Sequence, residues 1–480
     1  MLHFRGKKIG ISNLNKYKQK SNGNKCRILT YPTARAILNK SPCSVELCLR
    51  KETCDRAAAA RQGGKRMKTG LRKKAILGML LSVLVLAGCK DQKAQEFPDT
   101  PTPEYDAQNQ YIFMNPQGFY EAEGFFCGTN FGDDLLRYYD KGSGISGVLC
   151  PDPACTHDTD SCGAYAADGG TSVSVYNGKL YWVGEQLEGH KTILYRSDLS
   201  GANREEVLQL DWQKVILTYQ PQRYVIHRGY LYILGHSSEV NGAEVQSLES
   251  LLAVPLEGGQ EPAVVYEQEV NTYYESTYRF VGNSVYLEML TKSEDTWNIV
   301  ISRYDTPEKT WEPLYEEKNI SASIGKMWVT ETGEIYLPGI QDNQAYIWHL
   351  EAGSRKETAA WETADTDVPY LLEGIAVQST AREEIRWLEV VSYTGEHLYS
   401  GAMFPASVPG LEKDPGVTSG NPAEDYSMIF IGGDREKLVV SLFDFLGGES
   451  NTILLDLTDN LKPTVLWRST GDNGEKFFKK

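Results

Sequence analysis

The sequence predicts an all-β protein in which similar four-stranded sheets form a ring, the fold called a β-propeller. Three observations predict it. From about residue 110 to 470, short apolar strands and polar turns recur as one unit every 40–50 residues or so. Almost no segment of this region has a helical period. Gly, Asn or Asp marks most of the turns between the strands.

The second and third strands of the unit carry the repeat most clearly. Second strands rich in Tyr, Val and Leu are expected at 177–185, 228–236, 282–290, 332–340 and 435–443. The strands that follow them are expected at 192–201, 250–259, 299–308, 345–354 and 451–460.

The number of units predicts the number of blades. Seven units lie near 111–150, 172–210, 223–267, 278–316, 325–361, 370–404 and 427–468. The first and sixth match least well, so six or eight blades also fit the pattern. A single blade cannot bury both of its faces, and a closed ring of blades solves that problem. Two stacked β-sandwiches would give similar strand spacing but do not require a repeated motif.

A targeting segment precedes the repeats, at 67–88. Lys68, Arg72, Lys73 and Lys74 are followed by an uncharged run of twelve residues, 75–86. That run is too short to cross a bilayer, which needs about 20 helical residues, and is typical of a secretory signal peptide.

Leu86, Ala87, Gly88 and Cys89 resemble the lipobox of bacterial lipoproteins. The resemblance implies that the signal is cut before Cys89 and that this cysteine is lipidated. It therefore implies an extracytoplasmic protein, anchored by its lipid to the outer face of the cell membrane.

Other segments flank the repeats. Residues 1–66 are basic and precede the expected start of the signal, so we interpret them as an overlong reading frame or a disordered cytoplasmic extension. The polar, proline-containing stretch 89–109 is expected to be a flexible tether, and 471–480 a polar tail.

The charge of the mature region is strongly negative. Residues 1–88 hold 20 of the 49 Lys and Arg but only 3 of the 64 Asp and Glu, which leaves residues 89–480 with a net charge of −32. Such a charge argues against nucleic-acid binding, because phosphates require clustered cations. We expect a monomeric soluble domain.

Cys150, Cys155, His157 and Cys162 lie within thirteen residues, and Cys127 stands alone upstream. Three interpretations compete: two disulfides that include Cys127, a structural zinc site formed by the three other cysteines and the histidine, and free thiols. In each of them the role is structural.

The repeats resemble divergent WD40-like and TolB-like propellers, with a turn such as SDLSG at 197–201. The segment 135–165 resembles one found in lipoproteins of Firmicutes that carry a propeller of unknown function. This resemblance implies architecture and location, and no activity.

No catalytic motif is recognised in the mature region. The acidic residues are numerous enough for pairs to occur by chance, and the histidines, including His227, are scattered singly. We therefore favour a non-enzymatic platform that binds a protein, peptide or glycan. The alternatives are a glycan-active enzyme with carboxylates in the propeller funnel, and a structural partner in an envelope complex.

Overall fold

The computed structural model describes fourteen segments of the chain. They are residues 97–108, 118–129, 135–166, 171–186, 191–211, 220–241, 244–257, 262–269, 274–293, 296–363, 367–382, 385–403, 426–444 and 450–469. All belong to the compact unit that spans residues 92–480. The predictions for 1–66, for the signal at 67–88 with Leu86, Ala87, Gly88 and Cys89, and for the tail at 471–480 lie outside the described residues.

Seven antiparallel sheets, here called blades 1 to 7, follow one another along the chain. Blade 1 has β1 (Phe119–Ala122), β2 (Phe125–Gly128), β3 (Arg137–Asp140) and β4 (Ile145–Val148). Blade 2 has β5 (Thr171–Tyr176), β6 (Lys179–Gln186), β7 (Lys191–Asp198) and β8 (Glu205–Asp211). Blade 3 has β9 (Gln220–His227), β10 (Tyr230–Asn241), β11 (Glu244–Pro255) and β12 (Ala263–Glu269).

The other four blades repeat this arrangement. Blade 4 has β13 (Tyr274–Val281), β14 (Ser284–Ser293), β15 (Thr296–Asp305) and β16 (Thr310–Ile320). Blade 5 has β17 (Ser323–Ile324), β18 (Trp328–Val329), β19 (Ile335–Gln341), β20 (Gln344–Glu351) and β21 (Ser354–Glu362). Blade 6 has β22 (Tyr370–Leu372), β23 (Ile375–Arg382), β24 (Ile385–Ser392) and β25 (His397–Met403). Blade 7 has β26 (Tyr426–Gly433), β27 (Lys437–Asp444), β28 (Ser450–Asp456) and β29 (Lys462–Ser469).

Within each blade, consecutive strands pair in an antiparallel meander. In blade 5 the first strand is interrupted, and its two pieces, β17 and β18, both pair with β19. Over the described residues every regular element is a strand, which confirms the predicted all-β fold and its seven blades. No helix among these residues has the length and apolarity needed to cross a bilayer.

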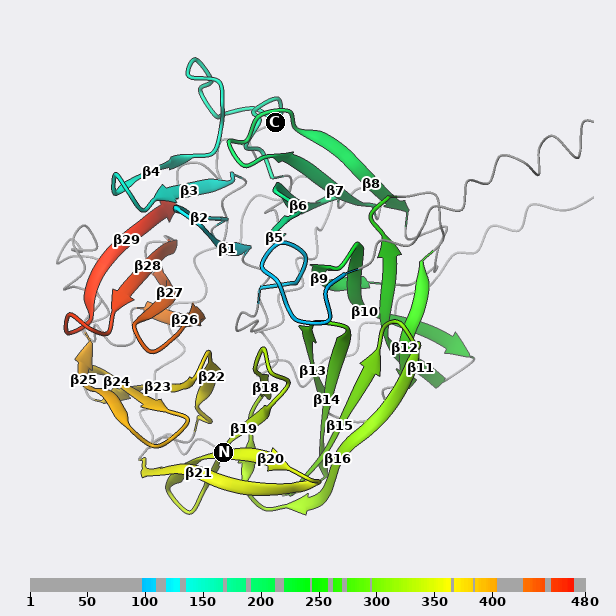
Figure 1. The fold of residues 1–480 in the computed structure, drawn as a ribbon, viewed down its shortest axis with the longest axis vertical. Coiled ribbons are helices and arrows are strands. Elements are labelled where there is room, and N and C mark those ends of the chain that lie inside the picture. Colours follow the sequence, from blue (N-terminus) through cyan, green and yellow to red (C-terminus); the bar gives the residue numbers. More distant parts are fainter. Residues whose placement is uncertain are drawn as a thin grey trace, which may run out of the picture. The chain divides into compact units, whose positions relative to one another are not determined.

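The hydrophobic core is divided into seven clusters, and each cluster joins two consecutive blades. The seventh joins blade 7 to blade 1, where Phe119 packs with a centroid distance of 6.0 Å against Trp467. Figure 1 shows β29 beside the strands of blade 1, so that side-chain packing closes the ring. Each of these two blades is built from four consecutive strands of the chain, and no strand is exchanged between them.

The turn between the first and second strands, called here the first turn of a blade, brings the backbone to the centre of one face of the ring. In blade 2 this turn is Asn177-Gly178, with φ angles of 48° and 69°. Asn and Gly tolerate this left-handed conformation, which gives a hairpin turn whose twist matches the strands.

Residues 97–108, named here the strap, differ from the flexible tether that the sequence predicted. Instead of extending freely, they lie at the centre of the ring, where Figure 1 shows them near β5, β9 and β13. The difference has a physical cause: the strap is held by backbone hydrogen bonds and one buried ion pair, which its polar composition does not reveal.

Candidate functional site

The strap is bonded to the first turns of blades 2, 3 and 4. Asn177 N donates to the carbonyl of Glu104 at 2.8 Å, and Arg228 N donates to the carbonyl of Tyr105 at 2.8 Å. These bonds satisfy turn amides that would otherwise face water, so the strap is part of the folded propeller.

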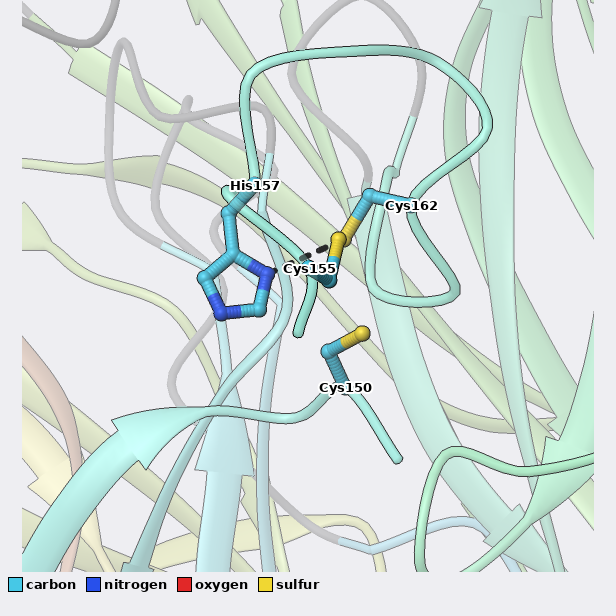
Figure 2. Close-up of side chains that lie close together, drawn as sticks. All are labelled: Cys150, Cys155, His157 and Cys162. Carbon is cyan, nitrogen blue, oxygen red and sulfur yellow. Dashed lines mark hydrogen bonds between the residues drawn. The ribbon is translucent and has the colours of Figure 1, made fainter. Parts of the chain in front are cut away.

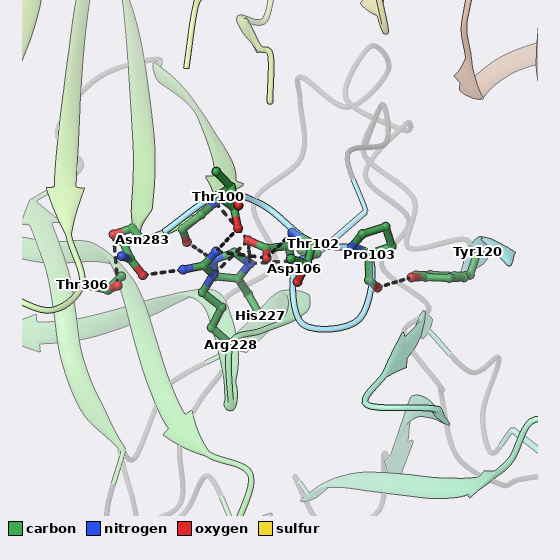
Figure 3. A network of polar contacts seen from close by, with 11 residues as sticks. Thr100, Thr102, Pro103, Asp106, Tyr120, His227, Arg228, Asn283 and Thr306 are labelled. Atoms are coloured by element: carbon green, nitrogen blue, oxygen red, sulfur yellow. Dashed lines mark hydrogen bonds and ion pairs between the residues drawn. The ribbon is translucent and has the colours of Figure 1, made fainter. Parts of the chain in front are cut away.

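A buried ion pair between Asp106 and Arg228 fixes the middle of the strap. Arg228 donates from Nε to Asp106 Oδ1 at 3.0 Å and from a terminal nitrogen to Oδ2 at 3.2 Å. The same carboxylate accepts the amides of Gly282 at 3.0 Å and Thr102 at 2.9 Å. Arg228 also donates to the carbonyl of Thr100 at 3.2 Å. Figure 3 shows this network between the strap and blades 3 and 4.

The backbone of Arg228 is strained to serve this network. Its φ of 44° is a left-handed conformation that a non-glycine residue rarely adopts. Such a conformation costs on the order of 1 kcal/mol and persists only when the surroundings require it. Here the conformation places the guanidinium, only 4% exposed as a residue, between Asp106 and the side chain of Asn283.

His227 is fully buried beside the ion pair, and its two ring nitrogens have different partners. Nδ1 accepts the amide of Ala107 at 3.1 Å, so the proton is on Nε2, which donates to the carbonyl of Gly282 at 2.8 Å. Burial lowers the pKa of His227 to about 4, although the Asp106 carboxylate acts in the opposite direction. The imidazole is therefore neutral at pH 7 and links the strap to blade 4.

A pocket of about 360 Å³ opens on the same face, between the strap and blades 1, 4, 5, 6 and 7. This volume is in the range of small-ligand pockets, which is about 300–1,000 Å³. Its apolar lining includes Phe119, Tyr120, Phe280 and Val439. Its charged lining consists of Asp106, Glu121, Glu331, Glu373, Asp434 and Lys437.

The charges of the pocket are only partly compensated. Glu121 is paired with Lys437 at 2.6 Å and with Lys141 at 2.9 Å. Partial burial disfavours its charge, but hydrogen bonds from the two lysines prevail and lower the pKa of Glu121. Within the described part of the chain, neither Glu331 nor Glu373 forms an ion pair.

Glu331, Glu373 and Asp434 occupy the first turns of blades 5, 6 and 7. Glu373 reaches solvent but lies in a concave wall, where partial desolvation and the nearby Glu331 and Asp434 raise its pKa. The Trp328 side chain and the Arg279 cation act in the opposite direction but do not prevail. Like charges this close destabilise one another. A cation entering the pocket would relieve that repulsion, so the arrangement favours positively charged ligands.

Sequence reasoning also missed a buried acidic residue outside the pocket, Glu288. Glu288 on β14 is fully buried and accepts the amide of Met327 at 2.9 Å. Burial raises the pKa of Glu288 to about 7. Arg279 lies nearby, with its guanidinium 4.6 Å from the centroid of a Trp328 ring. A charged residue inside the apolar run LEML was the signal that could have found this group.

Cys150, Cys155, His157 and Cys162 are brought together by the loop after β4, and their ligand atoms all lie within 4.8 Å of one another. Figure 2 shows the four side chains converging, with His157 Nδ1 3.4 Å from Cys162 Sγ. Cys127 is not part of this group: it lies fully buried on β2, in the core between blades 1 and 2.

Comparisons with known proteins give no family. No family model matches the chain, and no curated protein matches it. Among solved structures, the chain is similar to an acylaminoacyl peptidase of Pyrococcus horikoshii, with 10% identity, a TM-score of 0.42, and coverage of 80% of this chain and 55% of that one. An oligogalacturonate lyase in complex with manganese gives 13% identity, a TM-score of 0.42, and coverage of 74% and 91%.

TolB from Acinetobacter baumannii gives 12% identity, a TM-score of 0.31, and coverage of 69% of this chain and 70% of that one. The chain spans about half the length of the acylaminoacyl peptidase and puromycin hydrolase chains that it matches.

Proposed function

We propose that this protein is a membrane-anchored extracytoplasmic lipoprotein whose propeller is a binding platform, and that its central pocket binds a positively charged group such as the lysine side chain of a peptide. The lipobox supports lipidation at Cys89 and a location at the outer face of the cell membrane. The pocket supplies the binding site.

One observation carries the choice of ligand: Glu331 and Glu373 face the pocket and form no ion pair among the described residues, although the charge of Arg279 acts on Glu373. The net charge of −32 for residues 89–480 adds a long-range field of the same sign. The apolar walls, which include Phe119 and Phe280, would cover the methylene chain of a lysine while the carboxylates bind its ammonium group.

The strap explains why the ligand is expected on one side of the centre. It occupies the first turns of blades 2, 3 and 4, and its Gln108 pairs with both backbone polar groups of Glu121 on β1, at 3.0 and 3.2 Å. Among the described residues, the first turns that line the pocket beyond the strap are those of blades 5, 6 and 7.

Calorimetric titration of the full-length protein tests the proposal. The probe is a short peptide with two lysines, compared with the same peptide carrying glutamine at both positions. We expect the lysine peptide alone to bind, and its affinity to fall with added salt. The double variant Glu331→Gln/Glu373→Gln should bind at least about tenfold more weakly, a loss of about 1.4 kcal/mol.

The control is a double variant with the same net charge as Glu331→Gln/Glu373→Gln but with an unchanged pocket. Glu357→Gln/Glu362→Gln removes two exposed carboxylates from the outer strand β21 and should change the affinity less than about twofold. Equal weakening by both double variants would mean that the peptide responds to the overall charge, and the pocket would not be the binding site.

The anchor is tested separately by replacing Cys89 with Ala. We expect the wild-type protein to label with a radioactive fatty acid and to fractionate with membranes, and the variant to do neither. A wild-type protein that stays in the cytosol with its leader intact would refute the proposed location.

A glycan-active enzyme is the second candidate, because the carboxylates expected for it do gather in the funnel. Glu373, with its raised pKa, would be the proton donor and Glu331 or Asp434 the second carboxylate. Release of reducing sugar from cell-wall or plant glycans, lost in Glu373→Gln, would favour this candidate over a binding platform.

A further inference from the structure

The loop between β4 and β5 contains a cluster of four potential metal ligands that the pocket does not use. We propose that Cys150, Cys155, His157 and Cys162 bind one zinc ion, which fixes the connection between blades 1 and 2. The observation that points to it is the convergence of all four ligand atoms within 4.8 Å.

The distances suit tetrahedral coordination. With zinc bonds of about 2.3 Å to sulfur and 2.0 Å to nitrogen, neighbouring ligand atoms in a tetrahedron lie roughly 3.5–3.8 Å apart. His157 Nδ1 and Cys162 Sγ are 3.4 Å apart. The widest separation of 4.8 Å requires a contraction of about 1 Å, which changes in side-chain rotamers can supply.

The ligand set selects the metal and the kind of site. Thiolates and imidazole favour zinc over calcium or magnesium, which prefer oxygen ligands. Three sulfurs and one nitrogen complete the four-coordinate shell and leave no open position for a substrate. The site is therefore structural. Each thiol loses its proton to the solvent on binding, and the neutral imidazole binds through Nδ1.

Disulfides account for this cluster less well. The described cysteines form no disulfide, and three thiols cannot all be paired among themselves. The fourth thiol, Cys127, lies in the core between blades 1 and 2, where burial raises its pKa to about 12. One disulfide within the cluster would leave a third thiol and His157 without a role.

The ends of the loop reach the core between blades 1 and 2, where Cys162 is buried, but the middle of the loop has little apolar burial to hold it in place. Of residues 151–161, only Cys155 and His157 are even partly buried. His157 has a φ of 56°, an unusual conformation that turns its ring toward Cys162. A metal ion would supply the stabilisation that apolar burial does not supply here.

Beyond the cluster, the loop is joined to blade 2. Arg204 donates to the carbonyl of Cys162 at 3.0 Å, and its guanidinium lies 4.4 Å from the centroid of the Tyr195 ring on β7. Zinc bound to Cys162 would thus connect the end of β4 to the neighbouring blade through one short path.

Metal analysis of the full-length protein tests the proposal. The protein is produced in zinc-supplemented medium and purified under reducing conditions. We expect elemental mass spectrometry to find about one zinc ion per chain. Cys155→Ser and His157→Ala should each lose most of it, and Cys127→Ala should keep it. Cobalt exchanged into the wild-type protein should give the absorption spectrum of a tetrahedral thiolate site.

A second measurement does not depend on the folding of variants. Removal of zinc from the wild-type protein with a chelator should lower its melting temperature, and added zinc should restore it. Iron in place of zinc, a protein free of metal after zinc is added, or a mass two units lower from a disulfide within the cluster would overturn the proposal. None of these outcomes bears on peptide binding in the pocket.

Discussion

The strap covers the first turns of blades 2, 3 and 4, whereas the corresponding turns of blades 5, 6 and 7 face the pocket. In the covered half, Asp106 accepts four hydrogen bonds and is paired with Arg228. In the open half, Glu331 and Glu373 reach solvent and raise each other's electrostatic energy. One half of the face uses its carboxylate for stability, and the other holds charge that a ligand could neutralise.

The largest effect is expected in the covered half. Asp106→Ala leaves the guanidinium of Arg228 buried without its partner, so we expect the free energy of unfolding to fall by about 3–5 kcal/mol. Urea denaturation measures it. The matched change in the open half, Asp434→Ala, removes a half-exposed carboxylate that accepts the amides of Glu436 and Lys437, and should cost about 1 kcal/mol. Equal losses would erase the distinction between the two halves.

The pH dependence of stability should sharpen the same contrast. The pKa of His227 is about 4 in the folded protein and near 6.5 when unfolded, so the unfolded chain binds more protons between these values. Stability present above pH 6.5 is therefore lost as the pH falls toward 4, and at pH 5 the loss is about 2 kcal/mol.

His227→Gln isolates this contribution, because glutamine offers one acceptor and one donor but does not titrate. Its free energy of unfolding should change less than that of the wild type between pH 7 and pH 5. The protection of the Arg228 and Gly282 amides against hydrogen exchange, corrected for the slower intrinsic exchange at lower pH, should fall in the wild type over the same range; both amides bond to the strap. Parallel pH profiles for both proteins would show that His227 does not hold the strap.

The repeats of the sequence predicted much of the ring but not what covers it. Segments such as 177–185 combine a Gly-containing turn with a short apolar strand, and the recurrence of that pattern located even the weak first and sixth units, which form blades 1 and 6. The strap depends on Asp106 and Arg228, which are 122 residues apart in the chain, so no local pattern reveals it.

The candidate sites differ in the same way. Cys150, Cys155, His157 and Cys162 are close in sequence, so the sequence alone singled them out as one cluster, with disulfides, zinc and free thiols as the alternatives. Glu331 and Glu373 each lie in a turn, where a single acidic residue is ordinary. Only closure of the ring brings them to one pocket, which is why the sequence analysis attributed pairs of acidic residues to chance.

The smallest effect on stability is expected in the open half. Glu373 has a raised pKa, so its charge opposes folding above the pKa of the unfolded chain, and this penalty grows as the pH rises through the folded value. Glu373→Gln should therefore leave the protein as stable as the wild type or slightly more stable at pH 8, within about 0.5 kcal/mol. Lysine-peptide affinity should fall in the same variant. A variant that loses both stability and binding would mean that Glu373 supports the fold, and the open half would then resemble the covered one.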